Sequence, residues 1–142
     1  MLTADIGPMD KDLLVQDGPQ IEVMIGFDTK LKNTCPMPAL LDTGATYSCI
    51  DLELAKRLCL KQTDSRELVG AHEKRVTPFY RADIYIPQLK CAWRDEFGGL
   101  PLEENGFSCK VLIGRNLLSN LHLRYEGYTG KVLIEFPMQI LS

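Results

Sequence analysis

The residues best suited to chemistry lie in one short segment, in which an aspartate, a threonine and a glycine follow two leucines: Leu40-Leu41-Asp42-Thr43-Gly44. An apolar run that ends at a carboxylate predicts a buried strand that delivers the acid to a tight turn. Gly44 permits close backbone approach, and Thr43 places a hydroxyl beside the acid. A carboxylate held next to a second one can share a proton with it and activate a water molecule.

The elements around Asp42 decide whether this segment is more than a turn. As an ordinary surface turn, Asp42 would only bond its own backbone. The preceding Ala39-Leu40-Leu41 instead places the acid at the edge of the interior. A second apolar pair followed by glycine, Leu112-Ile113-Gly114, also leads into a predicted short helix. Two such elements predict a pseudo-symmetric scaffold that holds one acid.

Length and composition describe one ordinary globular domain. The chain has 142 residues, of which 45% are hydrophobic and 25% are charged. Its 16 Lys and Arg against 19 Asp and Glu give a net charge of −3, so we expect neither nucleic acid nor a membrane as a partner. No apolar run approaches the length of a transmembrane helix, and the first residues lack an apolar signal core. We therefore expect a cytoplasmic location.

The five cysteines do not form a ligand pattern. Their number is odd, no two are spaced as Cys-x-x-Cys, and His72 and His122 do not complete a metal site. We expect free, mostly buried thiols, with no metal and no cofactor.

The hydrophobic pattern predicts a mainly β chain with two short helices. Alternation predicts strands over residues 21–26 and 80–86, and a polar-tipped hairpin over 67–76. Ser48 or Asp51 can cap a first helix that runs to residue 58, and a second helix follows Gly114. Other segments are predicted as a strand at 110–113, a surface loop or long hairpin over 93–107, and a closing hairpin of 121–125 with 131–136.

Three units follow from these boundaries. Residues 1–19 hold two Gly-Pro pairs and are predicted as a flexible N-terminal lead-in. Residues 20–136 form the folded domain. Residues 137–142 are a C-terminal tail that could extend a dimer sheet or fray.

Three segments together resemble the retropepsin-like aspartic proteases, and are closest in pattern to the retrotransposon and bacterial branches. These segments are residues 39–45, 46–58 and 111–118, and the resemblance spans about residues 21–136. It implies an all-β fold, a closed, barrel-like acid-protease lobe that acts as a homodimer. The sequence supports the dimer independently, because a two-carboxylate site needs two acids and the chain has one Asp-Thr-Gly.

The resemblance also implies roles for the residues of the motif. Asp42 is the catalytic acid, Thr43 bonds across the dimer axis, and Gly44 contacts the substrate backbone. Ala45 and Thr46 line the substrate cleft.

Support for the site is implied at the second glycine element, by Ile113, Gly114 and Arg115. Arg115 resembles the arginine that braces the active-site loop, although a solvated helix charge is the alternative. Retroviral members usually have an acid where this chain has Thr46, so Arg115 must find another partner or a weaker one.

The family closes a β-hairpin over its substrate, and the candidate residues here are Val69, Gly70, Ala71 and His72. This tip has fewer glycines than the family usually shows. His72 could contact substrate or lie solvated in the turn.

The expected function is therefore aspartic endopeptidase activity on peptide or protein substrates. Two Asp42 carboxylates about 3 Å apart would share one proton and activate water by general acid–base catalysis. The alternative is a catalytically idle retropepsin-like domain that serves dimerisation or peptide binding, because a fold does not guarantee chemistry.

Overall fold

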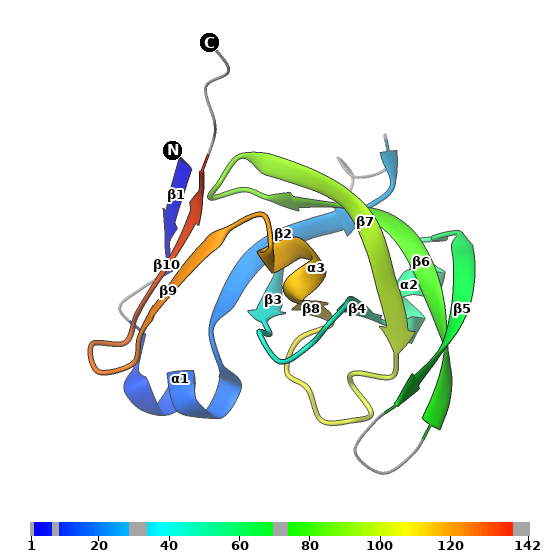
Figure 1. Cartoon of the computed structure of the whole chain (residues 1–142), viewed down its shortest axis with the longest axis horizontal. Coiled ribbons are helices and arrows are strands. Elements are labelled where there is room, and N and C mark those ends of the chain that lie inside the picture. The colour runs from blue at the N-terminus through cyan, green and yellow to red at the C-terminus, as the bar shows by residue number, and fades with distance from the viewer. Residues whose placement is uncertain (1, 7–8, 29–33, 70–73, 138–142) are drawn as a thin grey trace.

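The computed structural model describes residues 2–6, 9–28, 34–69 and 74–137 (Figure 1). These residues form ten strands and three short helices. The strands are β1 (Leu2–Asp5), β2 (Gln20–Gly26), β3 (Met37–Leu41), β4 (Ser48–Asp51), β5 (Gln62–Val69), β6 (Lys74–Ile86), β7 (Cys91–Leu100), β8 (Val111–Ile113), β9 (His122–Glu126) and β10 (Lys131–Phe136). The helices are α1 (Lys11–Asp17), α2 (Leu52–Arg57) and α3 (Arg115–Leu118). The prediction of a mainly β chain is confirmed, but its count of two helices is wrong, because α1 was not foreseen.

Seven strands make the main sheet, in the order β2-β3-β8-β4-β7-β6-β5. β2 pairs with β3 through its first half and with β6 through its second half, which closes six of the strands into a barrel. β5 continues past this closure as the outer strand of a hairpin with β6 (Figure 1). The predicted barrel-like lobe is therefore confirmed.

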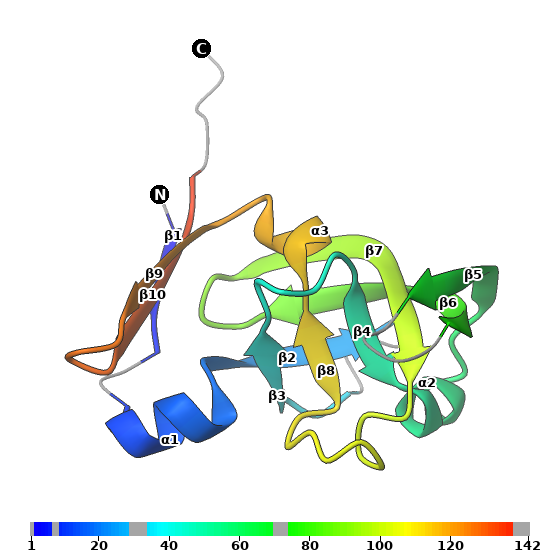
Figure 2. The ribbon, with the colours of Figure 1, turned by 60° about the horizontal axis from the view of Figure 1, so that its bottom comes forward.

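A smaller sheet, in the order β1-β10-β9, lies beside the barrel (Figure 2). β9 and β10 form the predicted closing hairpin, and β1 pairs antiparallel with β10. The sheet packs Ala4, Val132 and Ile134 into the same hydrophobic core as the barrel. The residues of the tail beyond Pro137 lie outside the described residues.

Alternating burial explains the central strands. Ile21, Val23 and Ile25 of β2 are buried while Glu22 between them is exposed. In β6 the residues Ala82, Ile84 and Ile86 point into the same core. One apolar face on each strand thus fixes the pairing register, because a shift of one residue would turn that face to solvent.

Residues 1–19 differ from the expected loose lead-in. They contain β1 and α1, with Ala4 and Leu14 buried. The Asp10 carboxylate caps α1 by accepting the Asp12 amide at 2.8 Å. Gly18 ends the helix at a φ of 75°, a positive value that glycine adopts readily. Asp10 and Gly18 were the sequence signals for α1, but the two Gly-Pro pairs favoured the prediction of an unstructured segment.

The segment 93–107 was predicted as a surface loop or a long hairpin, and its first part follows the hairpin alternative, because β7 pairs antiparallel with residues 79–86 of β6. Gly98 and Gly99 looked like loop residues but serve close packing. A Cβ on Gly99 would lie 2.7 Å from Cε2 of Tyr80. The glycines therefore let large side chains of β6 pack over a central strand.

Cysteine burial was overestimated. Cys49 and Cys109 are buried, Cys91 is intermediate, and Cys35 and Cys59 are exposed; all five are free thiols. No helix among the described residues is both long and apolar enough to cross a membrane.

Candidate active site

Asp42 lies where β3 leaves the sheet, beside the end of the parallel strand β8. Its amide donates to the Ile113 carbonyl at 2.8 Å, which fixes the start of the loop. Its carboxylate Oδ1 accepts the Gly44 amide at 2.9 Å, and its carbonyl accepts the Ala45 amide at 3.3 Å. The half-buried carboxylate is therefore held by its own turn and still reaches the surface.

The rest of this turn, which we call the catalytic loop (residues 42–47), is largely open. Thr43, Gly44 and Thr46 are exposed, whereas Ala45 is half-buried. A Cβ on Gly44 would lie 3.2 Å from Asp42 Oδ1. Glycine at this position thus gives the carboxylate room to bond the backbone.

Gly114 brings the second glycine element against the catalytic loop. A Cβ there would lie 2.6 Å from both the carbonyl carbon and the oxygen of Tyr47, and 2.9 Å from the Ser48 nitrogen. Its φ of −93° is available to any residue, so close approach is the reason for glycine. Ile113 is buried at the end of β8 beneath this contact.

Arg115 spans the catalytic loop from the first turn of α3. Its Nη1 donates to the Thr43 carbonyl at 2.7 Å, and its Nη2 donates to Thr46 Oγ1 at 3.0 Å. Its backbone amide donates to the Ala45 carbonyl at 2.8 Å. The neutral Thr46 hydroxyl is therefore the weaker partner that the sequence allowed for, and it accepts a hydrogen bond from the charged guanidinium in place of an ion pair.

Sequence reasoning missed the polar pair Ser48 and Asn116. Asn116 Oδ1 accepts the Ser48 amide at 2.8 Å and the Ser48 hydroxyl at 2.7 Å. Ser48 Oγ in turn accepts the Gly114 amide at 2.9 Å. Ser48 is fully buried and lies in β4, so it does not cap α2, and the Asp51 side chain makes no capping bond either.

The predicted substrate hairpin is present as β5 and β6, with Val69 paired to Lys74. Val69 is 78% exposed at the end of β5. Gly70, Ala71 and His72 lie outside the described residues, so their predicted contacts stay predictions.

The charge of Asp42 reaches the neighbouring strand. Burial, with a smaller contribution from the Asp42 carboxylate, raises the pKa of the Cys49 thiol to about 11. A thiol with so high a pKa is protonated at neutral pH and does not serve as a nucleophile.

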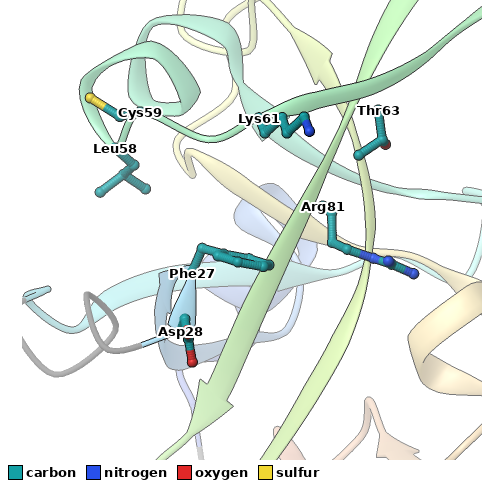
Figure 3. Close-up of a pocket in the computed structure, with 7 residues that line it drawn as sticks. All are labelled: Phe27, Asp28, Leu58, Cys59, Lys61, Thr63 and Arg81. Atoms are coloured by element: carbon teal, nitrogen blue, oxygen red, sulfur yellow. The ribbon is translucent and has the colours of Figure 1, made fainter.

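A cavity of about 430 Å³ lies elsewhere on the barrel (Figure 3). It contains none of the predicted site residues and is lined by Phe27, Asp28, Leu58, Cys59, Lys61, Thr63 and Arg81. The catalytic loop, with Thr43, Gly44 and Thr46 exposed, thus lies outside this cavity.

Comparison with known proteins agrees with this geometry. A family model described as aspartyl protease matches residues 27–86, the part of the chain that includes the catalytic loop and the β5–β6 hairpin. The fold is also that of a retropepsin-like aspartic protease from Rickettsia conorii, at a TM-score of 0.61 and 18% sequence identity, covering 93% of this chain and 89% of that one. The resemblance to retropepsin-like aspartic proteases is confirmed.

A viral protease also has a structure similar to that of this chain. The protease of simian foamy virus (mac) matches at a TM-score of 0.50 and 15% identity, covering 71% of this chain and 92% of that one. A search of curated proteins found no match to this sequence.

Proposed function

We propose that this chain is an aspartic endopeptidase whose site is completed by a second copy of itself. The observation that supports the proposal most is the set of bonds around Asp42: Gly44 orients its carboxylate, while Arg115 and the Ile113 carbonyl hold the loop. A surface turn without a function would not need bracing from residues so distant in the chain.

The proposal of a dimer rests on the number of catalytic carboxylates that each chain can supply. Aspartic protease chemistry uses two adjacent carboxylates, and this chain holds one Asp-Thr-Gly. A two-fold axis beside the exposed Thr43 would bring Asp42 against its own copy. In this arrangement Thr43 would bond across the axis, and Gly44, Ala45 and Thr46 would face the substrate. Residues 69–72 of the hairpin would cover it.

The proposed reaction needs only the two carboxylates and water. The ionised Asp42 takes a proton from water as the water oxygen attacks the scissile carbonyl carbon. The protonated Asp42 of the partner subunit donates to the carbonyl oxygen, which gives a tetrahedral diol. As the diol collapses and its C–N bond breaks, the carboxyl that took the water proton donates it to the amine nitrogen, while the other carboxylate takes a proton from a diol hydroxyl.

Cleavage of a peptide library from acidic to neutral pH tests the chemistry. Wild type should cleave best below neutrality, where one of the two carboxylates is protonated. Asp42→Asn should lose about 10²- to 10⁴-fold in rate, the usual contribution of a general acid–base. Asp12→Asn, on the exposed face of α1, is the matched control and should retain full activity. Unchanged cleavage by Asp42→Asn would rule out this mechanism.

Mixing subunits tests the shared site. An excess of Asp42→Asn protein should suppress wild-type activity, because mixed dimers carry a single Asp42. Sedimentation of the active species should give a dimer, and an active monomer would contradict the proposal. Binding of a statine-type inhibitor without cleavage at any pH would instead support the idle peptide-binding module.

A further inference from the structure

An arginine on the β5–β6 hairpin lies against the rings of two aromatic residues. The guanidinium carbon of Arg66 is 4.3 Å from the ring centre of Phe79 and 5.3 Å from that of Tyr47. The two rings meet edge to face, with centres 5.2 Å apart. Arg66 also donates from Nη2 to the Glu96 carboxylate and from Nε to Asp64 Oδ2, the latter at 2.8 Å. We call Tyr47, Arg66, Phe79 and Glu96 the Arg66 cluster.

The cluster joins four separate segments of the chain. Arg66 is on β5, Phe79 on β6, Glu96 on β7, and Tyr47 ends the catalytic loop. Gly98 of β7 lies opposite Phe79, and a Cβ there would be 3.4 Å from the Phe79 ring. The backbone of β7 at Gly98 thus lies next to the Phe79 ring.

The partners of Arg66 are themselves tied to the support of the loop. The Tyr47 backbone lies against Gly114. The Glu96 carbonyl accepts Asn116 Nδ2 at 3.3 Å, and the Asn116 amide donates to the Thr46 carbonyl at 3.2 Å. A continuous set of contacts thus runs from the hairpin to the residues that hold Asp42.

We propose that Arg66 is a positioning residue, which fixes the β5–β6 hairpin relative to the catalytic loop through Tyr47 and Glu96. A planar guanidinium suits this place because it can contact two rings and bond two carboxylates at once. Residues 62–69 and 74–79 would then move together with residues 42–47. The effect of Arg66 on catalysis rests on the proposed protease function, but its effect on the geometry of the loop does not.

The chain offers a matched control in Arg94. Its Nε and Nη2 donate to the Asp83 carboxylate at 2.7 and 3.1 Å, and its guanidinium carbon lies 4.5 Å from the Phe27 ring centre. Like Arg66, Arg94 combines a bond to a carboxylate with an aromatic contact, and its pair with Asp83 joins β7 to β6. None of these three residues belongs to the catalytic loop or to the contacts that support it.

The kinetic test compares Arg66→Gln, Arg66→Lys and Arg94→Gln at a temperature where all are folded. Arg66→Gln should lower kcat for peptide cleavage by up to about 100-fold, since a displacement of the reacting groups by about 1 Å can cost this much. Arg66→Lys should recover only part of the loss, because an ammonium cannot replace the planar fork. Arg94→Gln should keep kcat and KM at their wild-type values.

Amide exchange followed by NMR tests the geometry without any assay of cleavage. The amides of Asp42, Ala45 and Arg115 are bonded within the loop and its support. Arg66→Gln should speed their exchange by about 2- to 30-fold over the wild type, the range expected for a coupling of about 0.5–2 kcal/mol. Arg94→Gln should leave these rates unchanged.

The two tests separate the two proposals. If wild type cleaves no peptide but Arg66→Gln alone speeds loop exchange, the protease proposal fails and the positioning role stands. Equal loop exchange in Arg66→Gln and Arg94→Gln would overturn the positioning role, whether or not the protein is a protease.

Discussion

The two glycine-containing corners of the barrel follow the same local pattern but differ in burial. β3 leads into Asp42-Thr43-Gly44, and its parallel neighbour β8 leads into Gly114-Arg115. The first corner exposes Thr43 and Gly44, whereas Gly114 at the second is buried. The corner with the acid is open, and the corner without it is packed.

The difference shows how a reactive group can be both accessible and fixed. An exposed turn has few packing contacts of its own, so its geometry must be held from elsewhere. Here the buried corner supplies that support through Gly114, Arg115 and the Ser48–Asn116 pair. The proposed chemistry is therefore local to one corner, while its accuracy depends on the other.

Substitution of the glycine in each corner should give the largest difference in the free energy of unfolding between the two corners. Gly114→Ala should lower the free energy of unfolding by about 3 kcal/mol or more, at or above the top of the usual range for overpacking, because its Cβ would meet the Tyr47 backbone. Gly44→Ala should change it far less, since only the movable Asp42 carboxylate lies in the way. Urea unfolding at one fixed protein concentration measures both, and equal losses would contradict the contrast.

Loss of the Ser48 hydroxyl should be the next largest effect. Ser48→Ala leaves the buried Gly114 amide without its acceptor, which costs about 1–3 kcal/mol. Ser119→Ala is the control, because that hydroxyl is exposed and donates to the Asn116 carbonyl at the end of α3. Calorimetry or urea unfolding should show a clear loss for Ser48→Ala alone; a similar loss for Ser119→Ala would argue against a special role of the buried pair.

The contact between Arg115 and Thr46 should contribute little to stability. Both residues are exposed, so Thr46→Ala should cost no more than about 0.5 kcal/mol. Thr46→Asp would give Arg115 a charged partner and should add about 0.2–1 kcal/mol at low salt. Urea unfolding of both variants at low and high salt measures this pair. If Thr46→Ala lowered the free energy of unfolding as much as Ser48→Ala does, the main support of the catalytic loop would come from the exposed contact and not from the buried corner.

The smallest expected change is electrostatic. Because the Asp42 carboxylate contributes to the raised pKa of Cys49, Asp42→Asn should lower that pKa while burial still keeps it high. Alkylation of Cys49, followed by peptide mass spectrometry across alkaline pH, should become faster in this variant. Cys109 is the internal control, because its pKa is raised by burial and by Asp17 instead. Unchanged alkylation of Cys49 would show that the charge at position 42 does not reach β4.

Much of the fold was readable from local patterns. The alternation in β2 and β6, the apolar run before Asp42 and the hairpin of β9 with β10 all gave the correct elements. α1 was missed because its signals are one cap and one buried leucine, which the Gly-Pro pairs outweighed. β7 was predicted only as one of two alternatives, a loop or a hairpin, because Gly98 and Gly99 are typical of loops unless a large neighbour is known to pack over them.

The candidate site divides in the same way. The motifs name Asp42, Gly44, Gly114 and Arg115 through residue type and order alone. Asn116 and Ser48 lie 68 residues apart, and no local pattern indicates that their side chains meet. The partner of Arg115 was likewise undetermined until the fold placed Thr46 beside it.

Residue order alone was enough for the acid on its turn, the second glycine element and the family resemblance, because each is expressed within a few consecutive residues. Only the tertiary structure decided which corner is buried, which side chains support Asp42, and that Arg66 connects the hairpin to the catalytic loop. Those relations depend on strands that are distant in the chain and adjacent in the barrel, so no short stretch of sequence contains them.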